Sequence, residues 1–344
     1  MVSVGGKYIV NPDATIEAPT SAGIVTIPQL TAEVESGSPG TAKLGFSYLT
    51  GGLSWSADYT LTLPTKAQPA AGLECWASVV NKTGTEFPNA KLKFVAGSPN
   101  RATDPTLLGS GVATYGGAGL RSLNMESSGF VARKQANFRD VNVGELHAYP
   151  YEAQATIRQD QINRVRMMRN DDVVVKKWYG IQVPVLWRDG FYGNPEQRLT
   201  SNLGINFKND EASRLGKPMP AGAVRVYEPD ANGRPQYIGA ATLADTPKDA
   251  RVSLTLSNVF DVYAQAKLLK SEKVGKRKVR KTIELVVHNE KATNQEVRLV
   301  QNFYGAYKIV GETVKSAKLN ASQRQWTLDV PAGGETKLKV TAEF

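Results

Sequence analysis

The sequence has little of the chemistry that thiol and metal sites require. Cys75 is its only cysteine, so no disulfide can form within one chain. His147 and His288 are its only histidines, and no HxH, HExxH or CxxC spacing occurs. A tetrahedral zinc site or a multi-histidine copper site therefore cannot be built from one chain in the usual way. Cys75 itself is expected to behave as a small buried hydrophobe in a strand.

Long hydrophobic runs are absent as well. No window approaches the ~18 consecutive apolar residues of a membrane-spanning helix, so no transmembrane segment is expected. Residues 1–15, MVSVGGKYIVNPDAT, contain neither a charged n-region nor an apolar h-region. We therefore expect no signal peptide in the chain as given.

The familiar catalytic motifs are also missing. No G-x-S-x-G elbow supports Ser-His-Asp catalysis, and the glycine-rich residues 115–119 lack the Lys-Ser/Thr ending of a phosphate-binding loop. The acidic pairs at 171–172 and 210–211 fall in expected turns, where carboxylates usually make local hydrogen bonds rather than bind calcium or catalyse hydrolysis. The sequence does not establish an enzyme. It favours a non-enzymatic protein, with no cofactor predicted.

What the sequence has in excess is positive charge. Lysine and arginine number 42 against 32 aspartates and glutamates, a net charge of +10 that favours anionic partners. Residues 267–281 concentrate this charge. They are interpreted either as an anchor for an anionic polymer, lipid headgroup or acidic protein, or as a solvated hairpin or lysine-protected edge strand. The run has no aromatic residues for base stacking, so nucleic acid is not an expected partner. Its candidate binding residues are Lys276, Arg277, Lys278, Arg280 and Lys281.

Alternation of apolar and polar residues predicts an all-β fold. A period of two is that of a half-buried strand, because successive side chains leave opposite faces of the pleat. The clearest case points five apolar residues to one side: Trp55, Ala57, Tyr59, Leu61 and Leu63.

The spacing of strands and turns predicts two or three β-sandwich domains in tandem. Residues 1–145 are expected to form an N-terminal sandwich region that ends in a Gly/Ser-rich loop insertion at about 98–144. Residues 146–265 are expected to form a middle β domain. Residues 266–344 contain roughly seven short strands, which predicts an immunoglobulin-like domain without the Cys…Trp…Cys hallmark.

Two local patterns within the middle segment bear on its structure. Residues 153–169 fit either an amphipathic helix or a pair of strands, and we favour the strands. The sequence Asp230-Ala231-Asn232-Gly233 lies between two alternating runs, which predicts a tight hairpin turn.

Two further residue groups are candidates for binding. Trp187, Phe191 and Tyr192 lie in a loop rich in glycine and arginine, either as a contact surface for a partner or carbohydrate, or as buried loop anchors. The second group could hold a copper ion, and another subunit could complete that copper site if the chain forms an oligomer. The simpler interpretation of its histidine is a residue packed within a strand. Its members are His147, Tyr149, Met167 and Met168.

Several stretches together resemble the bacterial domain-of-unknown-function family number 4139, the mucoidy-inhibitor-like group. They are GLSWSADYTLTLP, VVNKTGTEFPNAKLKFVAG, ELHAYPYE, LGKPMPAGAVRVYEPDANGRPQYIGAATLADTPKD, FDVYAQAK and WTLDVPAGGETKLKV, within residues 40–344. The resemblance implies an exported, envelope-associated β-sandwich protein with no assigned catalytic residues. The chain departs from the family's pattern by lacking the export signal and the full N-terminal part.

Together, the residues and the resemblance predict a non-enzymatic protein of the cell envelope, periplasmic or at the cell surface. Its expected partners are envelope or surface-layer proteins, or an anionic envelope polymer, in what could be a surface complex. The alternative function is a copper-dependent redox enzyme, such as a superoxide-handling protein, and a less favoured one is a carbohydrate-binding module.

Overall fold

The protein is all-β, as its sequence predicts. The computed structural model describes residues 2–4, 7–9, 31, 33–35, 37, 39–41, 43–65, 68–96, 141–143, 146–184, 198–276 and 278–344. These ranges contain strands, turns and bends and no helix. The described residues accordingly include no helix with the length and hydropathy to cross a membrane.

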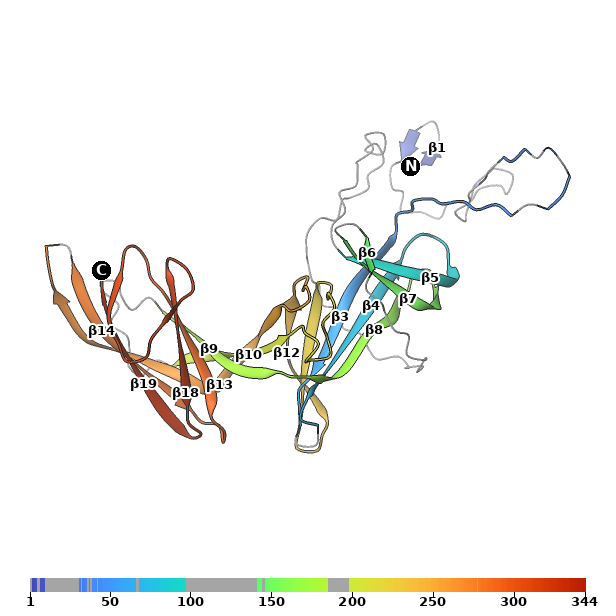
Figure 1. The fold of residues 1–344 in the computed structure, drawn as a ribbon. Coiled ribbons are helices and arrows are strands. Elements are labelled where there is room, and N and C mark those ends of the chain that lie inside the picture. Colours follow the sequence, from blue (N-terminus) through green and yellow to red (C-terminus); the bar gives the residue numbers. More distant parts are fainter. Residues whose placement is uncertain are drawn as a thin grey trace. The chain divides into compact units, whose positions relative to one another are not determined.

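Nineteen strands make up most of the described chain, and Figure 1 shows their order. They are β1 (Val2–Val4), β2 (Lys7–Ile9), β3 (Leu53–Thr62), β4 (Ala71–Asn81), β5 (Phe87–Ala96), β6 (Val141–Val143), β7 (Leu146–Ile157), β8 (Ile162–Val173), β9 (Lys176–Val183), β10 (Leu199–Lys208), β11 (Gly222–Pro229), β12 (Pro235–Leu243), β13 (Arg251–Lys273), β14 (Val279–Asn289), β15 (Gln295–Asn302), β16 (Lys308–Glu312), β17 (Ala317–Lys318), β18 (Gln323–Val330) and β19 (Gly334–Glu343).

The strands pair into four sheets in the described chain. A nine-stranded sheet has the order β16-β19-β14-β13-β10-β9-β15-β18-β17, and a five-stranded sheet has the order β12-β11-β3-β4-β8. A three-stranded sheet, β5-β7-β6, and the β1-β2 pair complete the set. By its contacts the chain divides into two compact units. The smaller is Met1–Ser54 with Val79–Ala90 and Thr156–Asn163, and the larger is Trp55–Ser78 with Lys91–Ala155 and Arg164–Phe344.

The alternation that the sequence shows in β3 is confirmed by burial. Tyr59 and Leu61 are fully buried, and Ala57 and Leu63 are only 2% exposed. Trp55, at the start of this row, is half-buried and packs on Phe94 of β5 with 5.1 Å between ring centroids. One face of β3 therefore faces a core, as the period of two requires.

The nine-stranded sheet curls around a hydrophobic core. The strands β16 and β18 lie near opposite ends of its strand order, yet the Trp326 indole N–H on β18 donates to Glu312 on β16 at 3.0 Å. The two ends of the sheet therefore approach each other, as in a sandwich. Large side chains of this core with at most 3% exposure include Ile181, Leu285, Leu299, Phe303, Trp326 and Leu338.

The predicted domain bounds fall within shared sheets. Strands from 146–265 pair in the nine-stranded sheet (β9, β10, β13), in the five-stranded sheet (β8, β11, β12) and in the three-stranded sheet (β7). Pairing of strands in a common sheet does not establish which segments of the chain fold independently. The three-domain division, the number of sandwiches in tandem and the immunoglobulin-like assignment therefore stay predictions.

Two local predictions in this part of the chain have clear outcomes. Residues 153–169 lie in β7, in β8 and in the turn 158–161 between them, which confirms strands over a helix. The turn 230–233 joins β11 to β12, with Gly233 at φ +76°, a backbone conformation that favours glycine. The Gly/Ser-rich insertion at 98–144 lies outside the described residues except for 141–143, which form β6 rather than a loop.

Buried asparagines hold two similar turns at strand ends. Asn81 donates through Nδ2 to the carbonyl oxygens of Thr85 at 2.8 Å and Ile157 at 3.1 Å. Asn289 donates in the same way to Thr293 at 2.9 Å and Val330 at 3.2 Å. In both turns the asparagine Nδ2 donates to the carbonyl oxygen of the residue four positions later in the chain. The asparagine Oδ1 accepts from the backbone N–H of the residue two positions later. These side chains replace backbone partners that the turn cannot supply.

Cys75 lies in the core of the larger unit, as predicted. It is 2% exposed, and its Sγ lies 3.9 Å from the Met167 Sδ. Burial raises the pKa of the Cys75 thiol to about 12, which disfavours the reactive thiolate.

We expect the Cys75 thiol to be protected from thiol reagents in the folded protein. Its reaction with a disulfide reagent at about pH 8 should be about a hundredfold slower than in denaturant, since thiolate formation and access both require opening. Stopped-flow labelling of the native and denatured chain measures both rates. Equal rates would contradict a closed core around this residue.

Candidate functional site

The structure separates some of the residues proposed for copper. Met167 is buried on β8 beside Cys75, whereas Met168, next to it on the same strand, points to the opposite face. Tyr149 on β7 is buried, and its hydroxyl donates to the Pro218 carbonyl at 3.2 Å. His147 is half-buried on β7. Copper binding by this set stays a prediction. Among the described residues, no group of three or more His, Cys, Asp or Glu side chains is placed to hold a metal ion.

Trp187, Phe191 and Tyr192 lie outside the described residues. Their role as a contact surface therefore stays a prediction.

The basic run forms the hairpin between β13 and β14, and much of its charge is already paired. Arg280 binds Glu343 of β19 at 2.6 Å and approaches Glu272 at 3.5 Å, while Lys270 binds Glu272 at 2.6 Å. The hydrogen bond from Arg280 holds the pKa of Glu343 below its ordinary value. Lys281 is buried, with 5% exposure. Much of the charge in the strand portion of this hairpin is therefore compensated, and two of the predicted binding residues, Arg280 and Lys281, lie in it.

The remaining charge gathers where the hairpin turns. The backbone N–H of Val274 donates to the Lys278 carbonyl at 3.0 Å and closes the turn. Lys273, Lys276 and Lys278, called here the hairpin tip, are exposed. No carboxylate of the described residues lies within ion-pair distance of these three lysines. Arg277 lies outside the described residues.

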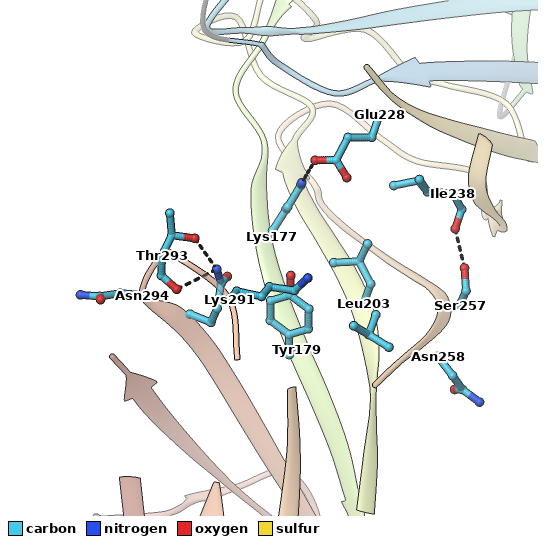
Figure 2. Close-up of a pocket in the computed structure, with 12 residues that line it drawn as sticks. Lys177, Tyr179, Leu203, Glu228, Ile238, Ser257, Asn258, Lys291, Thr293 and Asn294 are labelled. Atoms are coloured by element: carbon cyan, nitrogen blue, oxygen red, sulfur yellow. Dashed lines mark hydrogen bonds and ion pairs between the residues drawn. The ribbon is translucent and has the colours of Figure 1, made fainter. Parts of the chain in front are cut away.

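A pocket of about 560 Å³ opens elsewhere in the larger compact unit. Figure 2 shows its walls: the turn after β14 on one side, β12 and β13 on the other, and β9 and β10 between them. Its size is typical of a small-molecule site. It is lined by Lys177, Tyr179, Leu203, Glu228, Ile238, Ser257, Asn258, Val259, Lys291, Thr293, Asn294 and Gln295.

The charged groups of the pocket are neutralised in pairs. Lys177 of β9 forms an ion pair with Glu228 of β11. Lys291 binds Asp261 at 2.9 Å, and its ammonium lies 6.0 Å from the centre of the Tyr179 ring. Partial burial is the largest single influence and opposes the charged form of Lys291, but the hydrogen bond to Asp261 and the nearby charges of Asp261 and Glu228, with Tyr179, together outweigh it, so the pKa of Lys291 lies above its ordinary value. Both lysines therefore already have a counter-ion.

The other polar groups of the pocket are neutral. The Gln295 amide donates to the Thr293 hydroxyl at 2.7 Å and to the Thr293 carbonyl at 3.1 Å. The Asn294 Oδ1 accepts from the Ala332 backbone N–H at 3.0 Å. The side chain of Asn258 is exposed and makes no hydrogen bond to the described residues. The Ser257 hydroxyl donates to the Ile238 carbonyl.

Sequence reasoning did not find this pocket. Its residues come from six strands and a turn, and none belongs to a recognised motif. The sequence held one indirect signal, the similarity between the turn after Asn289 and the turn after Asn81. This similarity indicates an ordered turn at one wall of the pocket, but it does not identify the strands that form the opposite wall.

A family model described as "Domain of unknown function (DUF4139)" matches residues 44–344. No curated protein and no solved structure matches the chain. The family match confirms the resemblance seen in the sequence, and its description specifies neither an activity nor a partner.

Proposed function

This chain belongs to the family described as "Domain of unknown function (DUF4139)", and we propose that it is a non-enzymatic protein of the cell envelope that acts by contact with an anionic partner. The partner is an acidic envelope or surface-layer protein, or an anionic envelope polymer. The hairpin tip carries the proposal, because it holds three exposed lysines that form no ion pair with the described residues, on a turn closed by a backbone hydrogen bond.

Contact at the hairpin tip has a simple physical basis. Lysines without counter-ions release bound salt ions when they meet an anionic surface, and they steer association over about a Debye length. Below the tip, β14 pairs with β19, and Arg280 of β14 binds Glu343 of β19. These contacts fix the direction of the turn. The net charge of +10 adds a general attraction to the same partners.

Reversing the charge of the tip is expected to weaken binding to an envelope extract. For Lys276→Glu with Lys278→Glu we expect at least about a thirtyfold loss of affinity at low salt, since each lysine near an anionic surface contributes about 1 kcal/mol and the two together about 2 kcal/mol. The measurement is co-sedimentation with the extract over a salt series.

A matched control separates the tip from net charge. Lys91→Glu with Lys93→Glu makes the same charge change at two exposed lysines of β5. We expect this variant to retain most of the binding. Unchanged partitioning of the tip variant at low salt, or an equal loss in both variants, would reject the proposal.

A further inference from the structure

The pocket walls restrict the chemistry of what can bind there. An anionic ligand needs a cation without a counter-ion, but Lys177 is paired with Glu228 and Lys291 with Asp261. A cationic ligand needs a free carboxylate, and both carboxylates are engaged in these same pairs. A charged ligand would therefore have to break an ion pair before it gained one.

An apolar ligand fits poorly for the opposite reason. It would cover the amide of Asn258 and the hydroxyl of Thr293 without supplying hydrogen bonds, and a buried polar group without a partner costs about 1–3 kcal/mol. Leu203, Ile238 and Val259 give the pocket only a limited apolar surface. What suits these walls is a neutral molecule with many hydroxyl groups and some apolar C–H surface.

We propose that this pocket binds a neutral saccharide, with Asn258 and Thr293 as hydrogen-bonding residues on opposite walls. Asn258 offers an amide that has no hydrogen-bond partner among the described residues, and the Thr293 hydroxyl, which accepts from Gln295, keeps its own hydrogen to donate. Figure 2 shows the two residues on facing sides, with Tyr179 and Leu203 between them. This site is separate from the hairpin tip, so either proposal can fail without the other.

The test is titration calorimetry of the full chain with the neutral disaccharides maltose, cellobiose and chitobiose. We expect saturable binding of at least one, weakened about tenfold by Asn258→Ala with Thr293→Val, because two hydrogen bonds are lost at about 0.7 kcal/mol each. The control, Asn320→Ala with Thr327→Val, makes the same changes at exposed residues outside the pocket and should bind normally.

Charged probes and thermal unfolding complete the design. Glucuronic acid and glycylglycine are titrated in parallel, and both variants are melted to show that they remain folded. Absence of saturable binding for all three neutral disaccharides would overturn the proposal. So would equal weakening in the pocket variant and the control, or binding of a charged probe alone.

Discussion

Replacing Gly222 by alanine is expected to lower the free energy of unfolding by about 3 kcal/mol, the upper part of the range for overpacked cores. Gly222 begins β11 and lies opposite Ala57 of the parallel strand β3. A Cβ at this position would meet the Ala57 carbonyl oxygen at 2.1 Å and its carbonyl carbon at 2.8 Å. Such distances are far inside van der Waals contact, so one strand must move.

The neighbouring strands restrain that movement. β3 lies between β11 and β4 in the five-stranded sheet, and Tyr59 of β3 donates its hydroxyl to the Pro220 carbonyl at 2.7 Å just before β11. Since the clash is with backbone, no side-chain rotation can relieve it. Loss of the β11–β3 pairing, which runs from Gly222 to Tyr227, is the expected outcome.

A second glycine gives the control. Gly311 lies in β16, and a Cβ there would come no closer than 3.7 Å to Thr341. Neither glycine has a positive φ, so the two substitutions differ in the space available rather than in backbone strain. Urea unfolding of Gly222→Ala and Gly311→Ala measures the difference. Stabilities that agree within about 0.5 kcal/mol would show that the strands separate at little cost.

The features that the sequence predicts are those that depend on neighbouring residues. Alternation fixes which face of β3 is buried, and Tyr59 and Leu61 are fully buried as expected. Gly233 helps to determine its turn through a local backbone preference, since its φ of +76° is a conformation that favours glycine. The family, too, follows from local strings of residues that match over 44–344.

Pairing between distant segments could not be predicted in this way. Gly222 of β11 lies beside Ala57 of β3, and Val297 of β15 lies beside Tyr179 of β9, both in parallel register. Nothing near these residues specifies the distant partner, because any exposed strand edge offers the same backbone groups. The pocket depends on such pairings, and for that reason it has no signature in the sequence.

The same limit affects the candidate binding residues. A run with eight basic residues and Glu272 as its only carboxylate looks uncompensated along the chain. In the structure Arg280 pairs with Glu343, which is 63 residues away, and Lys281 turns into the protein. The charge density of the sequence therefore indicates the right hairpin but overstates its free charge, most of which, among the described residues, remains at the tip.

Asn289 links the stability of the fold to the shape of the pocket. It is 1% exposed, and its Nδ2 lies within hydrogen-bonding distance of three carbonyls, those of Thr293, Val330 and Pro331. Its Oδ1 accepts from the backbone N–H of Lys291 at 3.1 Å. The turn that it holds supplies Lys291, Thr293 and Asn294 to the pocket wall.

Asn289→Ala is expected to lower the free energy of unfolding by about 3 kcal/mol, because it leaves buried carbonyls and an N–H without partners. Asn320→Ala is the control: Asn320 also binds its own turn, through the N–H of Ser322, but it is exposed, so water replaces the lost bonds. Urea unfolding of both variants gives the comparison. A loss of less than about 1 kcal/mol for Asn289→Ala would contradict the anchoring role.

The substitution Asn289→Asp tests the donor groups alone. It keeps an acceptor for the Lys291 N–H but directs a carboxylate at carbonyl oxygens, so the folded protein should favour the neutral acid and raise the pKa of the introduced carboxyl above about 3.9. The deficit in the free energy of unfolding of this variant, relative to the native chain, should therefore be greatest above that raised pKa. It should shrink as the pH falls through the raised pKa, since the protonated carboxyl can donate a hydrogen bond again. Stability curves at several pH values measure this difference. A deficit that is constant from about pH 7 to pH 4 would mean that packing, rather than hydrogen-bond donation, is what Asn289 supplies.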